Sequence, residues 1–170
     1  MMTPKMEQAF NKQINFEFFS EYYYMAMSAY CESIDLPGFA SWMMAQGQEE
    51  HAHALRFYQF MLDRDARPSF AAIEEPKDTY DSVLDMFEHV LEHEKFVTKN
   101  ISDLYKLALE EGDYPSQIEL QWFITEQVEE EKTAKDIIQQ LRWIGDKSTA
   151  LFMLDQKMAE RSTAAAAPVE

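Results

Sequence analysis

The amino-acid sequence predicts an all-α domain: a four-helix bundle with a long crossover between its second and third helices and a short fifth helix at the C-terminus. Three observations lead to this fold class. Long stretches of the chain contain no proline, and its 170 residues include only 4 glycines. Apolar residues recur along these stretches at spacings of three and four, as on the buried side of a helix. The length suits one domain with a substantial core.

The first half of the chain predicts two long helices that form a hairpin. The first helix is expected over residues 4–33, because Thr3 offers a capping hydroxyl and a proline follows in the first turn. The segment DLPG, at 35–38, interrupts the helical pattern. A second helix is expected over 39–64. Residues 65–79 contain two prolines and no clean helical period, so they predict a long connection that crosses the bundle.

The second half predicts another hairpin. The third helix is expected to begin at residue 78 or 79 and to end at Gly112, since glycine suits the left-handed conformation that often follows a helix. Pro115 falls in the first turn of a fourth helix, which is expected to end near Ile144 and Gly145.

The C-terminal region predicts a short fifth helix from Asp146 to about Met158. The last residues, RSTAAAAPVE, resemble a frayed or disordered tail. One domain is therefore expected over residues 1–160, followed by a disordered segment over 161–170.

Composition restricts the possible partners. A formal net charge of −16 argues against nucleic acid and anionic lipid and suits cations, although taken alone it is more simply explained as a charge that keeps the chain soluble. No secretory signal and no apolar run of membrane-spanning length is present. The single cysteine, Cys31, excludes an internal disulfide and fits a reducing compartment. We therefore expect a cytoplasmic protein that binds neither nucleic acid nor membrane.

Polar residues interrupt the apolar seam of every long helix. They are Glu17 and Glu21 in the first, Gln46, Glu50 and His53 in the second, Glu94 in the third, and Gln127 and Glu130 in the fourth.

The two hairpins are expected to bring these interruptions to one level. Glu17 and His53 are equally far from residue 35 in the first turn, and Glu94 and Glu130 are equally far from Gly112 in the second. Residues equidistant from the turn of an antiparallel pair lie at the same height. If the hairpins dock with these levels matched, the polar residues form one cluster inside an apolar core.

Such a cluster predicts a metal site. A single glutamate in a seam is often only a register device, but buried carboxylates on four helices repel one another and need protons or a cation. Carboxylate oxygen with imidazole nitrogen suits divalent iron, manganese or zinc. Glu50 could bridge two ions, with Glu17 and His53 on one and Glu94 and Glu130 on the other.

These residues resemble those of the non-haem bacterial ferritins, over nearly the whole chain. The motifs are Glu17 with Tyr24, Glu49-Glu50-x-x-His53, Glu94, and Trp122 before Glu126-Gln127-x-x-Glu130. The second Glu-x-x-His motif of the wider ferritin-like class is altered here, because Glu130 replaces the histidine. His51 stands where the similar bacterioferritins have a haem-ligating methionine, so no haem is expected.

The resemblance implies a ferritin-like four-helix bundle that assembles into a 24-subunit shell. Each subunit would oxidise ferrous iron with dioxygen or peroxide at a di-iron ferroxidase centre and store the ferric product. It places Glu17, Glu50 and His53 at the first iron. It places Glu50, Glu94 and Glu130 at the second, with Gln127 as a near neighbour. Glu49, Glu126 and Glu129 would form a third iron site with Glu130. Tyr24 would be a phenol that supplies an electron or a hydrogen bond.

Other interpretations are consistent with parts of this pattern. One is a di-iron peroxidase or oxygenase of the same superfamily without storage, and another is a helical interaction protein without a metal. The third-site glutamates could also be ordinary solvated carboxylates. His89 and His93 are four residues apart, but they lie off the seam and are expected to face solvent.

Overall fold

The chain folds into five helices. The structure, a computed structural model, describes residues 2–145 and 148–165, with side-chain surroundings for 2–145 and 149–160. The helices are α1 (Pro4–Ser33), α2 (Pro37–Asp63), α3 (Val83–Glu110), α4 (Tyr114–Ile144) and α5 (Ser148–Ala165). The described residues contain no strand, so the predicted all-α class is confirmed. No helix among them combines the length and hydrophobicity needed to cross a lipid bilayer.

Helix ends follow the local signals in the sequence. The Thr3 side chain accepts a hydrogen bond from the backbone N–H of Met6, which caps α1. The Asp113 side chain caps α4 in the same way, by accepting from the N–H of Ser116. Between α3 and α4, Gly112 has a φ of 64°, a left-handed conformation that glycine adopts without strain. Both hairpin boundaries therefore lie close to their predicted positions.

The start of α3 differs from the prediction of residue 78 or 79. The helix begins at Val83, where the Ser82 side chain accepts from the N–H of Asp85. The preceding residues are held against α1, because the Tyr80 carbonyl accepts a hydrogen bond from the Tyr30 hydroxyl. The local Ser82 cap therefore marks the start of α3, and the residues before it remain part of the connection.

At the C-terminus, α5 continues through Ala165, beyond the predicted domain boundary at residue 160. Residues 166–170 of the predicted tail lie outside the described residues.

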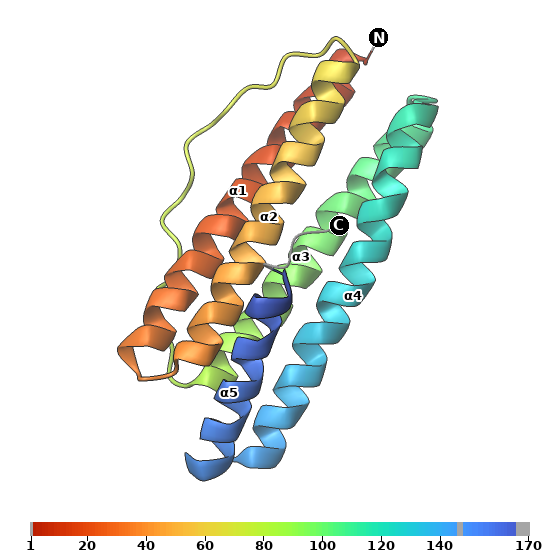
Figure 1. Cartoon of the computed structure of the whole chain (residues 1–170). Helices are drawn as coiled ribbons and strands as arrows, with labels where there is room; N and C mark the ends of the chain where they lie inside the picture. Colours follow the sequence, from red (N-terminus) through yellow and green to blue (C-terminus); the bar gives the residue numbers. More distant parts are fainter. Residues whose placement is uncertain (1, 146–147, 166–170) are drawn as a thin grey trace.

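The long connection after α2 gives the bundle its topology. Figure 1 shows α1 and α2 as one antiparallel hairpin and α3 and α4 as another, with the intervening segment running along the bundle beside α1. Hydrogen bonds attach this segment to α1: the N–H of Ser69 donates to Asn11 Oδ1 at 2.6 Å, and Asn15 donates to the Ala72 carbonyl at 3.3 Å. The predicted crossover is confirmed, and α2 and α3 consequently run in the same direction.

Two apolar clusters fill the bundle on either side of a polar layer. One contains Phe10, Ile14 and Phe57, and the other contains Tyr24 and Met27. Eight of the buried polar residues lie between these clusters, namely Gln13, Glu17, Gln46, Glu50, His53, Glu94, Gln127 and Glu130. The apolar clusters exclude water from the polar layer, so its charges must be balanced within it.

Candidate metal centre

One hairpin supplies three potential ligands. Glu17 comes from α1, and Glu50 and His53 lie one turn apart on α2. All three side chains are buried, and each offers a ligand atom within 4.8 Å of those of the other two. Nδ1 of His53 lies 3.4 Å from Oε2 of Glu50. Two carboxylates and an imidazole at this separation can share one divalent cation.

The other hairpin adds two buried carboxylates. Glu94 on α3 and Glu130 on α4 are both buried. The pKa of Glu50 is raised well above its usual range, first by burial and then by the negative charges of Glu94 and Glu130. Four carboxyl groups from four helices therefore meet in one layer.

In the described part of the chain, the Glu17 carboxyl lacks a hydrogen-bond donor for one of its two oxygen atoms. Burial is the main reason that its pKa is raised well above the usual range, and the charge of Glu50 raises it further. The two carboxyl groups lie beside each other. While both are ionised, neither can donate, and Oε2 of Glu17 is buried without a hydrogen-bond partner among the described residues. A shared proton or a bound cation would satisfy this oxygen.

Neutral amides hold three of the four carboxylates. Each donates one N–H to one carboxylate oxygen: Gln13 to Glu17 Oε1 at 2.8 Å, Gln46 to Glu130 Oε2 at 3.0 Å, and Gln127 to Glu94 Oε2 at 3.1 Å. These donors orient the acids without cancelling their charge. The sequence-based set of site residues did not include Gln13 or Gln46. Gln46 nevertheless interrupts the apolar seam of α2, and Gln13 lies one turn before Glu17.

Tyr24 lies at the same layer. Its side chain is fully buried, and its hydroxyl donates to Oε1 of Glu94 at 2.5 Å. Burial, followed by the charge of Glu94, raises the pKa of Tyr24 well above its usual range. The phenol therefore stays protonated and acts as a hydrogen-bond donor to Glu94.

Aromatic rings hold the imidazole of His53. Trp122 and Phe123 both meet it edge-on, with ring centroids 5.4 and 5.7 Å away. The guanidinium of Arg56 lies over the Trp122 ring, 4.0 Å from its centroid, and Nε of Arg56 donates to Glu119. This stack limits rotation of the His53 ring and covers one side of the centre.

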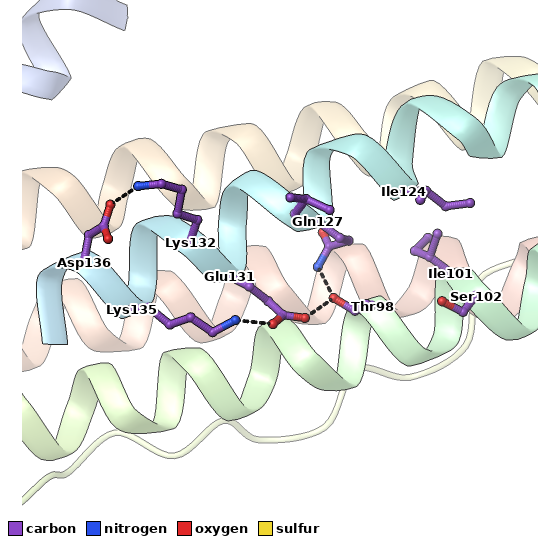
Figure 2. A pocket seen from close by; sticks show the side chains of 10 residues that line it. Thr98, Ile101, Ser102, Ile124, Gln127, Glu131, Lys132, Lys135 and Asp136 are labelled. Carbon is purple, nitrogen blue, oxygen red and sulfur yellow. Dashed lines mark hydrogen bonds and ion pairs between the residues drawn. The ribbon is translucent and has the colours of Figure 1, made fainter. Parts of the chain in front are cut away.

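Gln127 connects the centre with a surface groove between α3 and α4 (Figure 2). Its Nε2 also lies 3.3 Å from Oγ1 of Thr98. The Thr98 hydroxyl donates to Glu131 at 3.0 Å, and Lys135 donates to the other oxygen of Glu131 at 2.8 Å (Figure 2). Because the hydroxyl proton of Thr98 is directed to a carboxylate, its lone pairs face the Gln127 amide. The groove has a volume of about 560 Å³.

The predicted third-site residues lie at the edge of this layer. Glu49 and Glu126 are partly buried, and Glu129 is exposed. The charge of Glu49 contributes to the raised pKa of Glu50. Within the described part of the chain, only Glu17, Glu50 and His53 form a set of three with ligand atoms this close. The third site stays a prediction.

His93 is more enclosed than predicted, because its side chain is only partly exposed. Its Nε2 lies 2.8 Å from the Ser20 hydroxyl, and its ring packs against that of Tyr23 with centroids 5.0 Å apart. Burial lowers the pKa of His93. Aromatic residues on several sides of α1 cover this position, which the periodicity of α3 alone does not reveal. His89 is partly exposed and lies 2.8 Å from Nζ of Lys77.

The bundle and its buried layer define a class of protein. Glutamates from four helices, one in a Glu-x-x-His pair, are the ligand pattern of di-metal carboxylate proteins. Unpaired acceptors inside an apolar core fit a divalent cation and leave an uncompensated charge without one.

Comparison with known proteins identifies the family. The model of the ferritin-like domain matches residues 7–144. The bacterial non-heme ferritin of Staphylococcus aureus is 36% identical over 162 residues, which cover 95% of this chain and 98% of that protein. The ferritin of Staphylococcus haemolyticus is equally similar. The crystal structure of an open-pore ferritin from the archaeon Archaeoglobus fulgidus superposes with a TM-score of 0.92 at 45% identity, covering 94% of this chain and 98% of that one. The chain belongs to the ferritin family.

Proposed function

We propose that the buried carboxylate layer is the ferroxidase centre of this ferritin. The chain is an iron-storage protein with ferroxidase activity. In our assignment Glu17, Glu50 and His53 hold the first iron. The second iron is held by Glu50, Glu94 and Glu130, with Gln127 close by. Glu50 is the bridging residue, since its carboxyl lies beside Glu17 and within the field of Glu94 and Glu130.

One observation carries this proposal: the ligand atoms of Glu17, Glu50 and His53 lie within 4.8 Å of one another in a buried layer. Two ferrous ions bound side by side supply electrons to dioxygen or peroxide. The chain's own residues prepare the site. Carboxylates attract the cations and favour the ferric state, while the phenol of Tyr24 and the amide of Gln127 hold both oxygens of Glu94. The apolar clusters keep bulk water away.

Storage requires an assembly, and exposed apolar side chains support a homo-oligomer. Large apolar residues are exposed on several helices, among them Met25, Val128, Trp143, Phe152 and Met153. We propose the 24-subunit shell that the resemblance implies. We also propose that Glu49, Glu126 and Glu129 form a third iron site with Glu130. Localisation in the cytoplasm remains a prediction from the sequence.

Repeated aerobic addition of ferrous iron tests this function. We expect soluble ferric iron to accumulate far beyond the few ions that the named carboxylates can ligate, in an assembly of unchanged size. Saturation at those few ions would instead indicate a di-iron peroxidase or oxygenase and would refute storage. Sedimentation velocity before and after loading reports both the subunit number and the mass of retained iron.

A further inference from the structure

Gln46 occupies an unusual position in the polar layer. Its side chain is fully buried, with 0% exposed. It precedes Glu50 by one turn of α2 and therefore shares its side of the helix. Its Nε2 donates to Oε2 of Glu130 at 3.0 Å, across the interface between the two hairpins. The assignment of metal ligands above does not include this residue.

The contact with Glu130 determines the orientation of the Gln46 side-chain amide. A carboxylate oxygen can only accept, so it must face the N–H end of the Gln46 amide. The carbonyl oxygen, Oε1, is then the other end. It is buried and has no hydrogen-bond partner among the described residues. Buried polar atoms nearly always have a partner, so an amide oxygen in this state requires an explanation.

The unpartnered oxygen of Gln46 lies close to the Glu130 carboxylate. Given the length of the hydrogen bond and amide bond lengths of about 1.2 and 1.3 Å, Oε1 is within about 5.6 Å of Glu130 Oε2. Among the described residues, one other buried side-chain oxygen lacks a hydrogen bond, namely Oε2 of Glu17, which belongs to the same layer. Two buried oxygen atoms that accept no hydrogen bond, in one layer of carboxylates, indicate a binding site for a cation.

We propose that Gln46 is a further residue of the iron centre. Its amide N–H fixes the Glu130 carboxylate, and its carbonyl oxygen contacts the second cation, directly or through a water bound to that cation. This inference rests on the ferroxidase centre proposed above. A carbonyl oxygen adds a ligand for a divalent metal without adding a fifth negative charge to four carboxylates that already repel one another.

Anaerobic titration with cobalt(II), followed by calorimetry and visible absorption, tests the role of Gln46 without any oxidation step. We expect two tight equivalents per subunit at the ferroxidase centre of the unchanged protein, apart from any weaker binding at the proposed third site. Gln46→Leu should leave the first intact, weaken the second by about tenfold or more, and alter its absorption. Gln46→Glu keeps an oxygen at this position but loses the N–H that holds Glu130 and adds a charge, so it should retain the second equivalent better than Gln46→Leu, with a changed absorption. Gln48→Leu, at an exposed position on the same helix, is the matched control.

The outcomes separate this inference from the proposed function. Two equivalents with unchanged affinity and absorption in Gln46→Leu would overturn the role of Gln46, while the centre itself would stand if Glu94→Ala loses one. Two unchanged equivalents in both variants would overturn the centre as well. Circular dichroism and size-exclusion chromatography check folding and assembly. If Gln46→Leu fails either, Gln46→Met replaces it under the same expectations.

Discussion

Replacing Glu94 with alanine should abolish rapid iron oxidation while the bundle stays folded. Glu94 is buried on α3 and accepts hydrogen bonds from the Tyr24 hydroxyl and the Gln127 amide. The substitution removes one carboxylate from the second iron position. It leaves Glu17, Glu50 and His53 in place, so the first position should still bind iron.

The structure allows both effects to be estimated. At an effective dielectric constant of about 20, a carboxylate contributes about 4 kcal/mol for each positive charge about 4 Å away, and a divalent cation carries two such charges. Even if desolvation offsets half of this, the second cation should bind at least about a thousandfold more weakly. Stability should change much less. The donors on Tyr24 and Gln127 lose their acceptor, at about 1–3 kcal/mol each, but removing a buried charge beside Glu50 acts in the opposite direction. A net loss below about 3 kcal/mol leaves a typical domain folded.

Stopped-flow absorption after mixing with aerobic ferrous iron measures the rate, and thermal unfolding measures the stability. Glu94→Gln separates charge from packing, because it keeps an acceptor for Tyr24 but removes the carboxylate charge. It should regain stability without regaining oxidation. Glu92→Ala, whose side chain is 77% exposed on the same helix, is the control. Oxidation at the unchanged rate in Glu94→Ala would refute the assignment of Glu94 to the centre.

Three further predictions concern other parts of the molecule. In Gly38→Ala, the added Cβ would lie 1.8 Å from the Asp155 carbonyl oxygen, so α5 must shift. We expect the free energy of unfolding, measured by calorimetry, to fall by about 1–3 kcal/mol. An unchanged unfolding transition would contradict this close packing of α2 against α5. Thr98→Val removes an acceptor of the Gln127 amide and should slow initial oxidation about tenfold, whereas Thr98→Ser should not; equal rates would exclude the orienting role. Because burial raises the pKa of Glu17, the folded state binds more protons than the unfolded state. The metal-free protein should therefore lose stability as pH rises above the usual glutamate range, and Glu17→Gln should reduce this slope in urea titrations.

Helix positions and the polar layer could be predicted because local and periodic signals agree. On α3, Glu94 is the only polar residue in a seam that is otherwise apolar from Val83 to Ala108, and that contrast identified it. Capping residues such as Thr3 and Asp113 act through neighbours in the sequence, so these helix starts needed no knowledge of the fold.

Features that depend on contacts between distant segments could not be predicted in this way. The course of the connection before α3 is fixed in part by a hydrogen bond between the Tyr30 hydroxyl and the Tyr80 carbonyl, whereas the start of α3 itself follows the local Ser82 cap. The environment of His93 depends on which side of α1 packs against α3, and α1 is apolar on more than one side. Gln13 was missed for the same reason, since the seam of α1 is hard to distinguish from its other apolar positions. The periodicity of a sequence shows which side of a helix a residue occupies, but not which other segment packs against that side.

The hydrogen bonds to these carboxylates suit a centre that exchanges its metal. The donors described above are three glutamine amides and one phenol, all of them neutral. Lysine or arginine in their place would balance the charge permanently and compete with iron. Neutral donors fix the geometry and leave the charge to be balanced by protons in the empty centre and by iron in the loaded one. If iron binds here as proposed, it must displace protons from groups such as Glu17 and Glu50, whose pKa values are raised. In the proposed centre, the carboxyl groups would therefore exchange protons for ferrous ions, and no fixed cation among the donors described above would compete with the metal.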